Sequence, residues 1–127
     1  MVITRLISFL SIKPYPINIG NKMSTATQTK ANILGVIKTH HRQIKALGVK
    51  RLGLFGSYVR NEGSASSDVD FLVEFEAGQK TFDNFMQLSF LLEEILGRPV
   101  ELVTSESVSP YFRPHIVNEV EYVPLAA

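Results

Sequence analysis

Two aspartates, Asp68 and Asp70, stand two residues apart where the apolar run FLVEF begins. Along a β-strand, residues i and i+2 point to the same face, so the two carboxylates would project together, about 6–7 Å apart at the backbone. Without a cation between them, carboxylates this close repel each other. A divalent cation turns that repulsion into attraction, and Mg²⁺ prefers oxygen ligands. The spacing therefore predicts a site for one or two metal ions.

The dipeptide Gly56-Ser57 precedes this acidic pair by ten residues and follows a predicted strand over Val49–Phe55. Glycine lets the backbone approach a ligand closely, while the Ser57 hydroxyl and exposed N–H groups at a helix start suit a phosphate. The pattern thus predicts phosphate donors and metal ligands in one cleft. That combination suits nucleotidyl transfer, in which catalysis is mainly positioning and charge neutralisation. Two metal ions there would bind the attacking and the leaving oxygen.

The elements that must position these residues follow from hydrophobic periodicity and from glycine and proline punctuation. Besides the first strand, the sequence predicts helices over 31–47, 81–96 and 116–120, helical turns over 57–61, strands over 69–75 and 100–103, and a tail or edge strand over 122–124. In the second helix, Thr81 is the predicted N-cap and the apolar stripe is expected in the core; it comprises Phe82, Phe85, Leu88, Leu92 and Ile95.

The predicted fold class is α/β (α+β), with a small mixed β-sheet flanked by helices. The strand–helix–strand unit from Val69 to Val103 predicts a parallel pair with a right-handed crossover. A single domain is expected over 31–123, between an N-terminal extension over 1–30 and a tail over 124–127. Within the extension, Met23 opens a stretch typical of an ordinary cytoplasmic protein. Met1–Lys22 is interpreted as a misassigned start, with a disordered tail and then a signal peptide as the alternatives.

Composition narrows the function classes. The chain has 127 residues and a formal net charge of +1, without clustered Lys and Arg, so direct nucleic-acid binding is not indicated. It has no Cys, which excludes disulfides, thiolate metal sites and a Cys nucleophile and fits a reducing compartment. Its N-terminal apolar stretch is too short to span a membrane, so no membrane partner is expected.

The motif Gly56-Ser57, ten residues, then Asp68-Val69-Asp70 resembles the GS-x10-D-x-D signature of the DNA polymerase beta nucleotidyltransferase superfamily. LGLFGSYVRNEGSASSDVDFLVEF, EEILGRPVELVT and SPYFRPHIVNEVEYV are similar to its minimal nucleotidyltransferase (MNT) branch, and the resemblance covers 31–123. It implies Mg²⁺ with ATP or another nucleoside triphosphate as donor. It also implies that Asp68 and Asp70 are metal ligands and that Gly56 and Ser57 contact phosphates.

Two further site residues come from the same resemblance. The third family carboxylate maps to Glu101, where many relatives carry Asp; the longer side chain would hold metal differently or serve as the base. Arg60 matches a recurrent basic position, which implies a contact to triphosphate or a structural pair. Read alone, each feature also has a structural explanation: a helix cap at Gly56-Ser57, a turn aspartate at Asp68, and a solvated edge-strand residue at Glu101.

Members of the MNT branch often act as antitoxins beside a HEPN-domain toxin. The resemblance implies that they silence it by attaching AMP to a toxin tyrosine, with a hetero-oligomer as the working assembly. Two alternatives stay open. The chain could be a non-catalytic binding module that neutralises its partner by complex formation. It could also transfer AMP to a small molecule, although relatives that do so have longer chains with an acceptor-binding domain.

Overall fold

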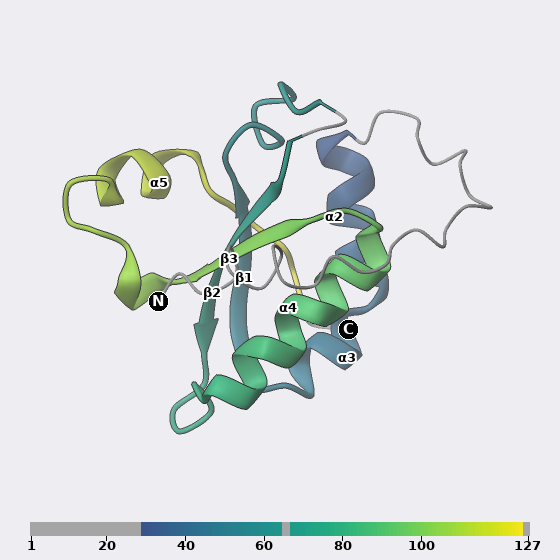
Figure 1. Ribbon diagram of the computed structural model, residues 1–127, viewed down its shortest axis with the longest axis vertical. Helices are drawn as coiled ribbons and strands as arrows, with labels where there is room; N and C mark the ends of the chain where they lie inside the picture. The colour runs from purple at the N-terminus through teal and green to yellow at the C-terminus, as the bar shows by residue number, and fades with distance from the viewer. Residues whose placement is uncertain (1–28, 65–66, 126–127) are drawn as a thin grey trace.

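The computed structural model describes residues 29–64 and 67–125, and the predicted N-terminal extension lies almost wholly outside them. Figure 1 shows a central sheet with most helices packed on one side and a short helix near the C-terminus on the other. In chain order the elements are α2 (Lys30–Thr39), α3 (His41–Lys45), β1 (Val49–Phe55), β2 (Val69–Phe75), α4 (Phe82–Leu96), β3 (Val100–Thr104), η2 (Ser105–Ser107), α5 (Arg113–Glu119) and β4 (Glu121–Tyr122). No helix in the described part of the chain is long and apolar enough to cross a membrane.

The sheet has the strand order β3-β2-β1-β4. Strand β1 runs antiparallel to both of its neighbours, whereas β2 and β3 are parallel. The predicted mixed sheet and the predicted parallel pair are therefore confirmed. The pair Glu121–Tyr122 forms the edge strand beside β1, opposite Gly53 and Leu54, which confirms the edge-strand reading of the C-terminal segment.

The core lies between the sheet and helices α2, α3 and α4. Alternation along the strands directs one set of side chains toward these helices. Fully buried members of this core include Ile33, Ile37, Ile44, Leu52, Leu54, Val69, Phe71, Val73, Leu88, Leu92 and Leu102. The alternate positions of β2, Asp70, Leu72 and Glu74, therefore face the opposite side, which we call the open face of the sheet. Segment η2–α5 lies on this side (Figure 1).

Helix α4 begins and ends as predicted. The Thr81 hydroxyl accepts a hydrogen bond from the Asn84 N–H at 3.0 Å, and Gly97 ends the helix in the left-handed region at φ 66°. The predicted stripe is wrong at Phe82, whose side chain is 61% exposed. A helical side chain covers the turn that precedes it, and Phe82 stands in the first turn, so it has no turn of its own helix to cover.

Three other elements differ from the prediction. The expected helix over 31–47 is divided at His40 into α2 and α3, because His40 leaves the helical region at φ −102° and ψ 22°. The expected helical turns over 57–61 are a series of tight turns, in which successive N–H groups bond to carbonyls three residues earlier. The last helix begins at Arg113 rather than Ile116, with Pro114 in its first turn, where a missing N–H costs nothing.

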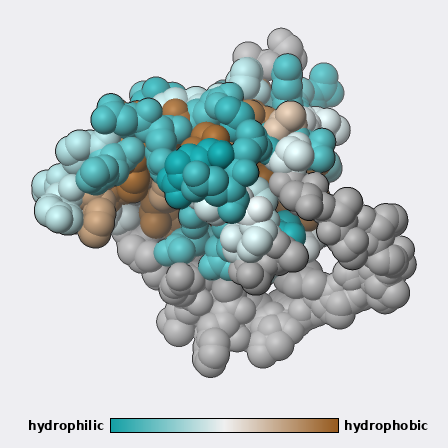
Figure 2. Space-filling view, turned by 90° about the horizontal axis from the view of Figure 1, so that it is seen from above, coloured by the Kyte–Doolittle hydropathy of each residue, from teal (hydrophilic) through white to brown (hydrophobic). Residues whose placement is uncertain are grey.

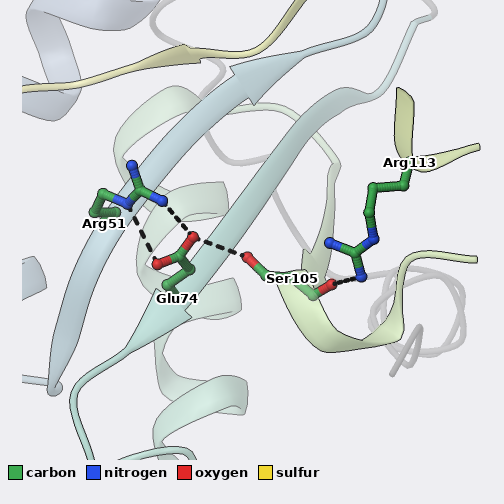
Figure 3. A network of polar contacts seen from close by, with 4 residues as sticks. All are labelled: Arg51, Glu74, Ser105 and Arg113. Carbon is green, nitrogen blue, oxygen red and sulfur yellow. Dashed lines mark hydrogen bonds and ion pairs between the residues drawn. The ribbon is translucent and has the colours of Figure 1, made fainter. Parts of the chain in front are cut away.

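The open face carries a polar network that links β1, β2 and η2 (Figure 3). The Arg51 guanidinium donates to both Glu74 carboxylate oxygens, at 3.3 and 2.7 Å, and Ser105 Oγ donates to Glu74 at 3.3 Å. The side chain of Arg113 in turn donates to the Ser105 carbonyl at 2.9 Å. This network fixes η2 against the centre of the sheet and so defines where the segment leading to α5 starts.

The Arg51–Glu74 pair makes stability depend on pH. Hydrogen bonding to Arg51 lowers the pKa of Glu74 below its ordinary value of 4.5. A depressed carboxyl pKa stabilises the fold above the unfolded-state value, and this contribution is lost as the pH falls through the folded-state value. Glu74→Gln should therefore lower the free energy of unfolding by less than about 1 kcal/mol at pH 7, since the pair is partly solvated.

Urea unfolding of the wild type and Glu74→Gln at pH 7 and pH 3 measures this effect. The gap between the two proteins should be present at pH 7 and shrink at pH 3. Glu94→Gln, on the exposed side of α4, is the matched control and should show no gap at either pH. A gap for Glu74→Gln that is equal at both pH values would contradict an electrostatic origin.

Candidate active site

The two sequence motifs meet at one end of the open face, where β1 ends and β2 begins. The antiparallel register places Phe55, the last residue of β1, opposite Asp70. Gly56 follows in the left-handed region at φ 83°. A Cβ atom added to Gly56 would collide with the Asp70 carboxylate, so the missing side chain leaves the space that this carboxylate occupies. The structure thus brings the Gly-Ser turn against the acidic strand.

The acidic residues lie at neighbouring ends of β2 and β3. Val69 is fully buried in the core, so Asp68 and Asp70 on either side of it face away from the core, toward the open face. The parallel register places Glu101 directly beside Asp70, on strands about 4.8 Å apart. All three side chains are half-buried. Register and alternation therefore put Asp68, Asp70 and Glu101 on one side of the sheet.

Magnesium suits this donor set. Within the described ranges 29–64 and 67–125, no three acidic or histidine side chains are gathered closely enough to form a complete metal cage. Mg²⁺ does not need such a cage, because it commonly binds one or two carboxylates and completes its octahedron with water and substrate phosphates. Paired carboxylates beside the Gly56-Ser57 turn fit that mode better than they fit a resident structural ion.

The turn after β1 is held by backbone bonds and by a buried aromatic ring. The Ser57 carbonyl accepts from the N–H groups of Arg60 and Glu62, at 3.1 and 2.8 Å. Tyr58 is 2% exposed, and its hydroxyl donates to the Ser64 carbonyl at 2.6 Å. Tyr58 therefore packs in the core. Ser57 itself is half-buried, with its side chain on the turn beside Gly56.

Arg98 anchors the loop that leads to Asp68, and sequence reasoning did not single it out. Its Nη2 donates to the carbonyls of Ser64 and Ser67, at 2.9 and 3.2 Å. Its guanidinium also lies 5.5 Å from the centre of the Tyr58 ring, within cation–π range. Arg98 follows the αL cap of α4 at Gly97, so it couples the end of that helix to the residue directly before Asp68.

Glu119, in the last turn of α5, is the second residue that the sequence did not reveal. Its Oε2 accepts a hydrogen bond from the Gly56 N–H at 2.8 Å, and its Oε1 accepts from Arg60 Nη1 at 2.7 Å. Arg60 Nε also donates to Glu62 at 3.0 Å. Bonding to Glu62 and then to Glu119 raises the pKa of Arg60. The structural-pair reading of Arg60 is thus realised, and its contact with triphosphate stays a prediction.

The comparisons with known proteins agree with this fold and arrangement. Residues 37–123 match the nucleotidyltransferase domain family, and the chain belongs to that family. It is 39% identical over 92 residues to MJ0435 of Methanocaldococcus jannaschii, described as a protein adenylyltransferase, covering 72% of this chain and 90% of the relative. It is 36% identical over 99 residues to the protein adenylyltransferase MntA of Thermococcus cleftensis, covering 77% of this chain and 99% of the relative.

Solved structures give the same fold. A structure described as a minimal nucleotidyltransferase superposes with a TM-score of 0.58 at 29% identity, covering 69% of this chain and 93% of the other. A toxin–antitoxin structure with AMP-PNP superposes with a TM-score of 0.53 at 23% identity, covering 66% of this chain and 72% of the other. The expected nucleotidyltransferase fold and enzyme class are therefore confirmed, and the chain is a member of the minimal nucleotidyltransferase branch.

Proposed function

We propose that the chain is a Mg²⁺-dependent protein adenylyltransferase that transfers AMP from ATP to a tyrosine of a HEPN-type toxin and so acts as its antitoxin. The observation that carries this proposal is the register that sets Asp70 beside Glu101 and against Gly56. This register brings the acidic strand ends and the Gly56-Ser57 turn to one place on the open face. The name of the 36%-identical relative, a protein adenylyltransferase, supports a protein acceptor.

The reaction joins the tyrosine oxygen to the α-phosphorus of ATP and breaks the bond to pyrophosphate, which leaves. Mg²⁺, held by Asp68 and Asp70, would neutralise charge on the phosphates and orient them. Gly56 and Ser57 would lie against the phosphate chain, where the missing Gly56 side chain permits close approach. Glu101 would complete the acidic set, either as a further ligand or by accepting the tyrosine proton.

The exposed border of the candidate site supports a protein acceptor over a small molecule. The open face at the site is bordered by the short helix α5, which has no buried residue. A docked partner would therefore complete the site from outside.

The test is transfer of label from α-labelled ATP to a candidate toxin, a small all-helical protein with an R-x4-6-H motif encoded beside this gene. Label should appear on a toxin tyrosine only when Mg²⁺ is present. If both proteins are well folded and no toxin tyrosine becomes labelled, the proposal is refuted. Rescue of toxin-expressing cells without any label transfer would favour the second candidate, neutralisation by binding alone.

A further inference from the structure

We propose that the Glu119 carboxylate occupies the place of a phosphate group at the Gly56-Ser57 turn, so that a nucleoside triphosphate must displace it to bind fully. This inference rests on the proposed function, because it assigns a ligand-competing residue to the same site. It concerns how the site regulates its own nucleotide affinity.

The first argument is the identity of the two donors. An anion at this turn would be bound by a backbone N–H and a guanidinium, the groups that commonly hold phosphate oxygens. In the structure both donors hold one carboxylate: the Gly56 N–H reaches Glu119 Oε2 at 2.8 Å, and Arg60 Nη1 reaches Oε1 at 2.7 Å. Glu119 thus presents two oxygens to the two groups that suit a phosphate.

The second argument is charge. Arg60 is bound by two carboxylates, Glu62 through Nε and Glu119 through Nη1, so its single positive charge is already matched. A triphosphate would also meet the negative charge of Glu119 at close range. Like charges brought together in a partly desolvated site oppose binding, and removing one of them lowers that cost. Withdrawal of Glu119 would release Arg60 Nη1 and the Gly56 N–H to the phosphates.

The third argument is the freedom of the helix that carries Glu119. Helix α5 has seven residues, none of them buried, and no side chain caps its N-terminus. Val117 within the helix is 58% exposed, and Tyr111 and Phe112 just before it are 77% and 56% exposed. A helix with so little burial can shift at small cost, whereas α4, with six buried residues, cannot. Displacement of Glu119 therefore requires no rearrangement of the core.

The two partners of Arg60 differ in a way that supplies a matched control. The Glu62 side chain is 64% exposed and does not contact the Gly56 N–H, whereas the Glu119 side chain is 26% exposed. Solvent screens Glu62 more strongly. Glu119→Gln should thus change nucleotide affinity more than Glu62→Gln, although both changes remove one negative charge beside the same guanidinium.

The experiment is calorimetric titration of the full chain with Mg²⁺ and AMP-PNP, together with thermal unfolding to verify folding. Glu119→Gln should bind AMP-PNP about fivefold more tightly than the wild type, and Glu62→Gln within about twofold. In the wild type, AMP-PNP should also increase hydrogen exchange across residues 113–120. Unchanged or weaker binding by folded Glu119→Gln would overturn the displacement proposal while leaving the proposed function intact. Absence of AMP-PNP binding in every variant would overturn both.

Discussion

Replacing Asp68 or Asp70 with alanine should lower AMP transfer to the toxin by at least about a thousandfold, because electrostatic stabilisation of the phosphates is the largest catalytic contribution expected here. Val69 anchors this segment in the core, and the acidic side chains lie on the opposite side of the sheet. Loss of one carboxylate should therefore weaken Mg²⁺ binding while β2 remains in place. Label incorporation and Mg²⁺ titration calorimetry measure the two effects.

The matched control for these variants is Glu76→Gln, an exposed acidic residue directly after the other end of β2. This change also removes one negative charge, but at the end of β2 away from the candidate site, so label incorporation should be unchanged. Circular dichroism and thermal unfolding should show that both alanine variants remain folded. Incorporation that survives in folded Asp68→Ala and Asp70→Ala would refute the assignment of these residues.

The second large effect is expected for Gly56→Ala. The new Cβ would sit where the Asp70 carboxylate lies, and the backbone at φ 83° also disfavours any side chain. Relief of the collision requires movement of either the turn or Asp70, and both belong to the candidate site. The variant should lose about 1–3 kcal/mol of unfolding free energy and at least about a hundredfold in AMP transfer.

Gly78→Ala separates the two causes of that effect. Gly78 has almost the same backbone conformation, at φ 79°, but nothing lies within 4 Å of its added Cβ. It should lose about 1 kcal/mol of stability from backbone strain alone, with AMP transfer preserved. Urea unfolding and label incorporation on both variants give the comparison. Equal losses of activity for the two variants would show that the contact with Asp70 does not matter.

The features that the sequence predicted are those with a local signature. The ends of α4, at Thr81 and Gly97, were predictable because a hydroxyl N-cap and a left-handed C-cap each depend on only a few neighbouring residues. The parallel pairing of β2 with β3 follows from the helix between them. The Asp-x-Asp spacing fixes a common face through strand alternation. These inferences need no knowledge of distant parts of the chain.

The features that were missed depend on distant contacts or on exact position. Glu119 is a single acidic residue on a short helix, 63 positions from Gly56, and no spacing or periodicity in one sequence links the two. Arg98 looks like any charged residue after a helix, and its role appears only once the loop before Asp68 is placed beside it. The prediction failed at Phe82 because periodicity assigns a face of the helix but does not account for a position in its first turn.

Because β3 and β4 are the two edge strands, the segment between them must be long enough to span the width of the sheet. The chain leaves the sheet at one edge, β3, and returns at the other, β4, with strands β2 and β1 between them, so residues 105–120 cross the open face. Gly53 leaves room there for Val120 and Tyr122, and the Arg51 guanidinium lies 4.2 Å from the centre of the Tyr122 ring. Seen from above in Figure 2, the coloured surface is largely hydrophilic, with small apolar areas between the polar residues.

The length of segment 105–120 is therefore more tightly constrained than the identity of its exposed residues. Changes at exposed positions such as Tyr111 and Val117 should cost little stability, since these residues contribute little burial. Adding or removing a residue would instead slide Glu119 past Gly56 while the helices and strands of the core stayed intact. In the divergence of such chains, insertions and deletions in this segment would retune the site long before they endangered folding.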